Sequence, residues 1–364
     1  MNGRVDRRVL GVSVLLVLAG LVILYSASAP FSLRHYGSDT HMLFKQLLAA
    51  TAGIVLLVFF SVFDYHRLTA INDLLFVGAI GLTILTVLPL GIGDGRWLSI
   101  GPFAVQPTEL VKFTLIVYFA GAISRKGESI RSFRHGVLPF IAVLGLLGAV
   151  ILNQPDLGML LIYGALTVTM LFFGGANPWH LGAIGCGALP LVAMAIRLAP
   201  YRFARILSFL NPQAYSTSSG YQTIQSLIAV GSGGVLGRGL GASRAKLFYL
   251  PQAHNDFILS IVAEETGLLG TLVVLGLVAF LVWRAFAISE RAPDRLGQLL
   301  ALGIGFVIGF QALLNAGVAL GILPVTGLTF PFLSNGGSSL VVTLAMIGVL
   351  LNVSKQASPQ GAAR

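Results

Sequence analysis

The residues that could do chemistry in this sequence are ionisable side chains inside or beside long apolar runs. Asp256 is the most informative of them, because it ends a polar segment, about 201–256, in which it is the only acid. Together with its border, this segment carries the bases Arg197, Arg202, Arg205, Arg238, Arg244 and Lys246. An aspartate in this setting can serve as a general base, or it can cap the apolar helix that follows. The residues alone leave both roles open.

Other ionisable residues fall within the apolar runs, where a charge is costly and points to a function or to a buried partner. Glu109 and Lys112 are three residues apart, so on a helix they share a face and can pair. A structural ion pair explains them as well as a catalytic role does. Lys112 must offset part of the negative charge of Asp73, Glu109, Glu264 and Glu265. The two neighbouring glutamates can brace the bundle or line a proton path, and bracing is the favoured interpretation.

The composition indicates what kind of scaffold positions these groups. Of 364 residues, 56% are hydrophobic and only 10% are charged, whereas a soluble domain is usually about 25% charged. This excludes a cytosolic enzyme, a secreted disulfide-linked scaffold and a disordered chain. The single cysteine, Cys186, cannot form an intrachain disulfide or a cysteine-rich metal site. The net charge of +10 favours membrane lipids or an anionic lipid-linked substrate over nucleic acid as partners.

The apolar runs predict an all-α polytopic membrane protein. A spanning helix needs about 20 apolar residues, because about 30 Å of hydrocarbon is crossed at about 1.5 Å per residue. Ten runs meet this requirement, near 9–28, 46–63, 70–90, 107–124, 136–153, 157–173, 178–199, 257–285, 297–320 and 339–353. We therefore expect one integral membrane domain, 1–364, with 201–256 as a large loop between the seventh and eighth spans.

The distribution of lysine and arginine predicts the orientation. Thirteen of them fall in the termini and one set of short loops, and three fall in the opposite short loops. Because basic loops are retained in the cytoplasm, both termini are predicted to be cytoplasmic and 201–256 extracytoplasmic. No cleavable signal peptide is visible. A long loop can escape the charge rule, so the basic character of 201–256 does not contradict this orientation.

Polar segments rich in glycine and proline are predicted to gather on the outer side. They are 95–97 with 106–109, 154–158, 231–234 with 251–257, and 331–339. Irregular backbone at a membrane is tolerated where protein or a water-filled cavity satisfies its polar groups. The segments therefore predict one shared outward cavity, although each of them can also be a turn that caps a helix.

Taken together, these segments resemble the SEDS family (shape, elongation, division and sporulation proteins). The motifs that carry the resemblance are GDGRW at 93–97, QPTEL at 106–110, QPDLG at 154–158, GSGGVLGRGLG at 231–241, LPQAHNDFILSIVAEETG at 250–267 and PVTGLTFPFLSNGGSS at 324–339. They cover nearly the whole chain in the expected order. The resemblance implies a peptidoglycan glycosyltransferase that polymerises lipid II into glycan strands at the outer face of the bacterial cytoplasmic membrane.

The resemblance also implies roles for individual residues. Asp256 would be the general base, and one base without a covalent nucleophile implies inversion at the anomeric carbon. The residues expected to bind substrate are Arg96, Trp97, Gln106, Glu109, Lys112, Asp156, Arg202, Arg205, Ser232, Gly233, Arg238, His254 and Ser338. Among them, the arginines would steady the diphosphate, and Trp97 would stack on a sugar or prenyl segment or belong to an interfacial belt. A divalent cation, Mg²⁺ or Mn²⁺, can assist, without an assigned set of metal ligands.

Within the family, the short N-terminal tail and 324–327 favour the elongation branch over the division branch. The chain departs from the family pattern at Gln252, Asn255 and Asn335, where glutamate, threonine and tyrosine are usual. The implied partners are lipid II, the growing glycan strand and a class B penicillin-binding transpeptidase. The membrane helix of that transpeptidase would pack on the eighth and ninth spans at Gly305 and Gly309. The alternatives are a flippase for the lipid-linked precursor and a scaffold that positions another enzyme.

Overall fold

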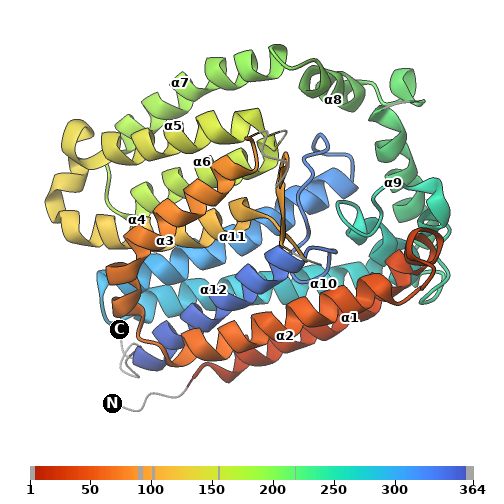
Figure 1. Ribbon diagram of the computed structural model, residues 1–364, viewed down its shortest axis with the longest axis horizontal. Helices are drawn as coiled ribbons and strands as arrows, with labels where there is room; N and C mark the ends of the chain where they lie inside the picture. Colours follow the sequence, from red (N-terminus) through yellow and green to blue (C-terminus); the bar gives the residue numbers. More distant parts are fainter. Residues whose placement is uncertain (1–4, 89–92, 101–102, 155, 218, 358–364) are drawn as a thin grey trace.

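The computed structural model describes residues 5–88, 93–100, 103–154, 156–217 and 219–357. Long helices run side by side through the molecule, and the two ends of the chain lie at the same end of the bundle (Figure 1). These helices are α1 (Arg7–Tyr36), α2 (His41–Val62), α3 (Tyr65–Leu85), α4 (Pro107–Lys126), α5 (Leu138–Asn153), α6 (Leu157–Phe173), α7 (Pro178–Arg197), α10 (Ile258–Arg291), α11 (Arg295–Ala319) and α12 (Gly337–Gln356). The chain is thus an all-α polytopic membrane protein, as the sequence predicts.

Eight helices in the described part of the chain are long and apolar enough to cross a membrane. They are α1, α2, α3, Phe133–Asn153 (which contains α5), α7, α10, α11 and α12. The other two predicted spans correspond to α4 and α6, which lie within the same bundle (Figure 1). Helix α6 has 17 residues, and α4 carries Glu109, Lys112, Arg125 and Lys126. Most of α4 is buried, so neighbouring helices shield it from lipid.

Local sequence sets where these helices begin and how closely they pack. The side chains of Asp64, Asp156 and Asp294 accept backbone hydrogen bonds at the starts of α3, α6 and α11, as N-caps do. Helices α11 and α12 form the centre, because most of each is buried. At Gly348, a Cβ would lie 2.5 Å from the Leu57 carbonyl oxygen, so only glycine permits the contact between α12 and α2.

The segment predicted as a long loop is largely helical. It contains α8 (Pro200–Leu210), η3 (Gln213–Tyr215), α9 (Ser219–Gly233) and η4 (Ala245–Tyr249). Helices α8 and α9 lie at the end of the bundle away from the chain termini (Figure 1). Two further short helical pieces, η1 (Gly127–Arg131) and η2 (Phe133–Val137), connect α4 to α5 at the opposite end.

The turn that follows α9 is joined to α10 through backbone hydrogen bonds. Helix α10 is interrupted at Gly267, where φ is +67°. At this break the amides of Arg238 and Gly239 donate to the carbonyls of Glu264 and Glu265, both at 3.0 Å. In return, the carbonyls of Gly234 and Val235 accept from the amides of Leu268 and Leu269. The polar groups freed by the helix break are thereby satisfied, as a membrane protein requires.

Glu264 and Glu265 anchor the same turn with their side chains. Glu264 accepts hydrogen bonds from the Ser243 hydroxyl at 2.5 Å and the Arg244 amide at 3.0 Å, and it pairs with Arg238 at 3.3 Å. Glu265 pairs with Lys246 at 2.8 Å and accepts from Ser26 of α1 at 2.6 Å. These contacts hold the turn after α9 against α10 and α1, so the two glutamates have a structural role. Because both are paired with other cations, Lys112 forms its ion pair with Glu109.

Gly305 and Gly309 lie inside the chain's own helix packing. A Cβ at Gly305 would lie 2.7 Å from the Cβ of Ala285, and one at Gly309 would lie 3.0 Å from a methyl group of Val282. Both neighbours belong to α10, so the pair of glycines lets α11 approach α10. The expectation that these glycines receive a partner's helix is therefore wrong.

The contact between α9 and α10 gives a stability prediction. A Cβ at Gly233 would lie 1.9 Å from the Ala263 carbonyl oxygen, whereas a Cβ at Gly231, two residues earlier, meets nothing within 4 Å. Overpacking of this kind typically destabilises by about 1–3 kcal/mol. We therefore expect Gly233→Ala to lower the melting temperature of the detergent-solubilised protein and to expose 201–250 to protease. Gly231→Ala is the matched control. Equal melting temperatures for the two variants would contradict the close packing.

Candidate active site

A small β-sheet places Arg96 at the end of the bundle that carries α8 and α9. Strands β1 (Gly93–Asp94), β2 (Trp97–Ile100) and β3 (Phe103–Val105) pair antiparallel in sequence order. Asp94 pairs with Trp97, so Gly95 and Arg96 form a two-residue hairpin turn. Gly95 has φ of +64°, a conformation that favours glycine. The turn fixes Arg96 at the tip of the hairpin and leaves Trp97 partly exposed beside it.

Asp156 lies where α5 ends and α6 begins. It is 2% exposed, and one carboxylate oxygen accepts the Met159 amide at 3.2 Å. The other accepts from the Gln106 side chain at 3.2 Å and lies 4.0 Å from Arg96. Burial raises the pKa of Asp156, while Arg96 opposes this rise. Pro155, which is part of the same motif, lies outside the described residues.

Asp256 precedes α10 but does not cap it. The N-cap position is Phe257, and no side chain makes a capping hydrogen bond there. Within the described residues no donor bonds the Asp256 carboxylate; its backbone carbonyl accepts from Asn315 at 2.9 Å. That same Asn315 amide also donates to the Leu328 carbonyl at 2.7 Å, which ties the Asp256 segment to the loop before α12. The capping interpretation of Asp256 is therefore wrong, and its carboxylate is available for chemistry.

The charges around Asp256 come from three separate segments. Burial raises the pKa of Asp256, Arg205 and Arg96 oppose this rise, and Asp156 adds to it, so that the pKa is about 6. Arg205 of α8 donates to the Val325 carbonyl at 3.2 Å, and burial lowers the pKa of its guanidinium below the usual value. Two carboxylates and two guanidiniums thus interact electrostatically at the site.

Gly327 lies close to both Asp256 and Arg96. A Cβ at this position would be 3.4 Å from Arg96 Nη1 and 3.9 Å from Asp256 Oδ2, which is ordinary van der Waals contact, and φ is +78°. The positive φ would strain any residue with a side chain, so this backbone conformation favours glycine.

Glu109 and Lys112 lie below this cluster in the interior of the bundle. They are 1% and 0% exposed, and Lys112 Nζ is 2.5 Å from Glu109 Oε2. Lys112 also donates to Gln311 of α11 at 2.8 Å, and Gln311 in turn donates to the Thr329 carbonyl at 2.9 Å. The pair therefore connects α4, α11 and the loop before α12, which is the structural role left open by the sequence.

Several other predicted residues support the cluster without facing Asp256. The Ser338 hydroxyl accepts the Gln106 amide at 3.0 Å and so positions Gln106 beside Asp156. His254 is buried against Phe31, with ring centroids 4.7 Å apart, and burial lowers its pKa to about 4. A neutral His254 thus holds the turn that leads into Asp256.

The remaining predicted residues lie elsewhere. Ser232, Gly233 and Arg238 belong to the contact with α10, where Arg238 donates to the Ser232 carbonyl and pairs with Glu264. Arg202 is buried and donates to the carbonyls of Leu152 and Ala195. The structure does not bring these four residues to Asp256.

The departures from the family pattern contact one another. The Asn255 amide nitrogen donates to Gln252 Oε1 at 2.5 Å, and the Asn335 amide nitrogen donates to Asn255 Oδ1 at 3.2 Å. Gln252 has φ of +56° and is exposed. Its side chain lies on the solvent side of the turn before Asp256 and accepts the hydrogen bond from Asn255. These residues form one chain of amides next to the candidate base.

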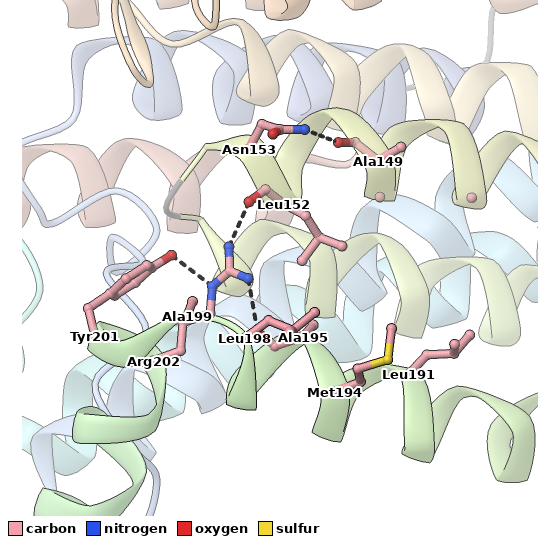
Figure 2. A pocket seen from close by; sticks show the side chains of 12 residues that line it. Ala149, Leu152, Asn153, Leu191, Met194, Ala195, Leu198, Ala199, Tyr201 and Arg202 are labelled. Carbon is pink, nitrogen blue, oxygen red and sulfur yellow. Dashed lines mark hydrogen bonds between the residues drawn. The ribbon is translucent and has the colours of Figure 1, made fainter.

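An apolar groove between α5, α7 and the start of α8 was not predicted (Figure 2). Its volume is about 790 Å³, and its lining includes Gly145, Leu152, Leu191 and Leu198. The polar atoms near one end come from Asn153, Tyr201 and Arg202 (Figure 2). The apolar residues that line the groove cannot be distinguished in the sequence from residues that face lipid. The groove depends on the spacing between α5 and α7, which the sequence does not give.

The donor set for a metal ion is small. Among the described residues, no group of three histidine, cysteine, aspartate or glutamate side chains is arranged to hold one. Asp156 is already engaged by Gln106 and Met159, which leaves Asp256 as the open carboxylate. The residues described therefore do not form a protein-only metal site.

Comparisons with known proteins show which family the chain resembles. A family profile described as "Cell cycle protein", covering FtsW, RodA and SpoVE, matches residues 6–359. The chain is 38% identical to the probable peptidoglycan glycosyltransferase FtsW of Geobacter metallireducens, over 96% of this chain and 95% of the relative. It is 40% identical to the stage V sporulation protein E of Bacillus subtilis, over 94% and 95%.

Solved structures extend the likeness to the fold. One, described as "Structural coordination of polymerization and crosslinking by a peptidoglycan synthase complex", matches with a TM-score of 0.80 and 29% identity, covering 98% of this chain and 99% of that chain. The rod shape determining protein RodA of Thermus thermophilus matches with a TM-score of 0.70 and 28% identity, covering 97% of both chains. With a profile match over almost its full length, this chain belongs to the FtsW/RodA/SpoVE family, the SEDS proteins.

Proposed function

We propose that this chain is a peptidoglycan glycosyltransferase that polymerises lipid II, with Asp256 as the general base. The observation that supports this most directly is the state of Asp256. Its carboxylate caps no helix, has a pKa of about 6, and interacts electrostatically with the guanidiniums of Arg96 and Arg205. Relatives at 38–41% identity are named peptidoglycan glycosyltransferases.

The proposed chemistry follows from these charges. The acceptor sugar's hydroxyl must lose a proton as its oxygen bonds to the anomeric carbon of the donor. A base with a pKa near 6 is mostly deprotonated at neutral pH and still accepts a proton well. Arg96 and Arg205 would stabilise negative charge on the departing diphosphate. A single displacement assisted by one base inverts the anomeric carbon.

A divalent cation stays a separate proposal. Mg²⁺ or Mn²⁺ would arrive bound to the diphosphate, and the Asp256 carboxylate could serve as its protein ligand. It would supply additional positive charge to the leaving group. No step of the proposed mechanism depends on it.

The apolar groove between α5 and α7 could bind the polyprenyl chain of the substrate. A polyprenyl chain is apolar, whereas its diphosphate needs cations. The groove between α5 and α7 is largely apolar, and Arg202 lies near one end of it (Figure 2). Arg205 lies about one helical turn further along α8 and donates to the Val325 carbonyl in the loop before α12. Helix α8 therefore supports a path from a membrane-embedded tail to the site of reaction.

The orientation, location and partner belong to the same proposal. Asp256 interacts electrostatically with Arg205 of α8, and α8 lies at the end of the bundle opposite the two termini (Figure 1). With cytoplasmic termini, as the basic loops predict, the site opens on the outer face of the bacterial cytoplasmic membrane. The synthase complex that matches this fold couples polymerisation to crosslinking. This supports a class B penicillin-binding transpeptidase as the partner.

The biological branch is better supported as division or sporulation than as elongation. The relatives at 38–41% identity are named FtsW or stage V sporulation protein E, whereas the RodA structures are 27–28% identical. The elongation assignment made from the tail and from 324–327 therefore has the weaker support. We propose an FtsW-like role.

The first prediction concerns the base itself. Asp256→Asn keeps the shape of the side chain but cannot accept the proton, so glycan polymerisation by purified protein from lipid II should fall by about 10²–10⁴. Because the Asp256 side chain caps no helix, the melting temperature should stay unchanged. The matched control is Asp39→Asn, a partly exposed aspartate that accepts from Tyr25. Near-normal polymerisation by Asp256→Asn would refute the assignment, and a flippase would not need this proton acceptor.

A second prediction follows from the pKa of Asp256. The base is active when deprotonated, so the rate should rise with pH through about 6 and then level off. Arg205→Gln removes a group that lowers this pKa and should move the midpoint to higher pH. Asp156→Asn removes a group that raises it and should move the midpoint to lower pH. Rates measured from pH 5 to 8 test both; midpoints that shift in the same direction would contradict the electrostatic arrangement.

The groove gives a third prediction. Gly145 lines it, and a Cβ there meets nothing within 4 Å, so Gly145→Trp should fold and fill the groove. We expect KM for long-chain lipid II to rise severalfold, with little change for a short-chain analogue. Gly182→Trp on α7 is the control, since Gly182 is equally open and does not line the groove. An equal effect on both chain lengths would exclude the groove as the binding site of the prenyl chain.

A further inference from the structure

Asp73 is the intramembrane acid that the structure leaves without a partner. Glu109 pairs with Lys112, Glu264 with Arg238 and Glu265 with Lys246. Asp73 belongs to α3, and its side chain is exposed. Among the described residues, no hydrogen-bond donor or cation contacts its carboxylate. This is unusual, because charged residues in spanning helices almost always face the bundle interior or a wet cavity.

The position of Asp73 along α3 excludes a simple interfacial location. It lies eight residues after Tyr65 and twelve before Leu85, or about 12 Å and about 18 Å from the two ends of the helix. The neighbouring Asn72 donates to the carbonyl of Thr114, which is well inside α4. The carboxylate is therefore near the middle of the membrane, beyond the reach of lipid headgroups.

The surface around Asp73 is otherwise suited to lipid or to another apolar helix. Leu74 is 79% exposed, Val77 66% and Ile71 46%. Helix α3 runs along the surface of the bundle, in the part of the chain coloured orange in Figure 1. An ionised carboxylate on such a face is costly unless it takes up a proton or another molecule supplies a donor at the same depth.

A second copy of this chain does not supply that donor. Copies in one membrane are related by rotation about its normal, so each residue meets partners at its own depth. In the described spanning helices, the cation at mid-depth is Lys112, which is fully buried and already paired with Glu109. Arg67, on the same helix, lies about 9 Å nearer the end of α3. A symmetric dimer through α3 would place one Asp73 near the other.

We propose that the face of α3 formed by Ile71, Asp73, Leu74 and Val77 docks a transmembrane helix of a different membrane protein. That helix carries a lysine or arginine near its midpoint, which pairs with Asp73. The pairing fixes the depth and rotation of the docked helix, while the apolar residues supply the packing. This surface is separate from the candidate active site and from α10 and α11.

The test uses site-specific photocrosslinking in cells that carry the full chain. A photoreactive residue at position 74 should capture a membrane protein with a basic residue in the middle of a spanning helix. Asp73→Ala should reduce the crosslink at least tenfold, and Asp73→Glu should retain it. A photoreactive residue at Val55, an exposed position on α2, is the control for lipid-facing surface.

Reciprocal substitution decides between a specific pair and mere proximity. Asp73→Lys should abolish the crosslink, and replacing the partner's basic residue with aspartate should restore it. The purified protein should keep its melting temperature and its glycan polymerisation in Asp73→Ala, because the described residues give Asp73 no hydrogen bond or ion pair to lose. Crosslinks to lipid only or to a second copy, or a crosslink unaffected by Asp73→Ala, would overturn the proposal. So would a captured helix without a central basic residue.

Discussion

A carboxylate inside an apolar bundle needs cations or hydrogen-bond donors, and Glu264 and Glu265 show how much of this structure meets that need. They lie just before the break in α10, and their side chains collect Ser26 from α1 and Arg238, Ser243 and Lys246 from the turn after α9. The backbone around Gly267 joins the same turn to α10. Glu264 and Glu265 thereby join α1, the turn after α9 and α10 to one another.

The candidate base, Asp256, illustrates the opposite case: its carboxylate is not fully paired, and this sets its pKa. Among the described residues no donor bonds the Asp256 carboxylate; burial raises its pKa, while Arg96 and Arg205 stop the rise near 6. Full pairing would make it a poor base, and full isolation would keep it protonated at neutral pH. The intermediate value arises because the two arginines are held elsewhere, Arg96 on its hairpin turn near Asp156 and Arg205 by the Val325 carbonyl.

The sequence predicted the all-α membrane fold well, because a run of about 20 apolar residues rarely forms anything but a spanning helix. It also predicted that 95–97, 154–158 and 251–257 meet, and Arg96, Asp156 and Asp256 do share one electrostatic environment. It failed for 231–241, where Ser232, Gly233 and Arg238 were expected to bind substrate but belong instead to the close contact with α10. Residue type and spacing give the flexibility of a glycine segment, but not the element that it contacts.

Neighbouring residues on one short helix illustrate the same limit. Arg202 and Arg205 of α8 are three positions apart and looked equivalent as diphosphate ligands. Arg202 donates to carbonyls near the ends of α5 and α7, whereas Arg205 reaches the loop before α12. The departures at Gln252, Asn255 and Asn335 carry the converse lesson, since three changes that look independent in sequence form one hydrogen-bonded chain. The Asn255 amide donates with its nitrogen and accepts with its oxygen, so its two hydrogen bonds use separate atoms, whereas a threonine would have to make both from one hydroxyl oxygen on a shorter side chain. The amides at these positions are therefore best understood as a single structural unit that supports the turn leading to Asp256.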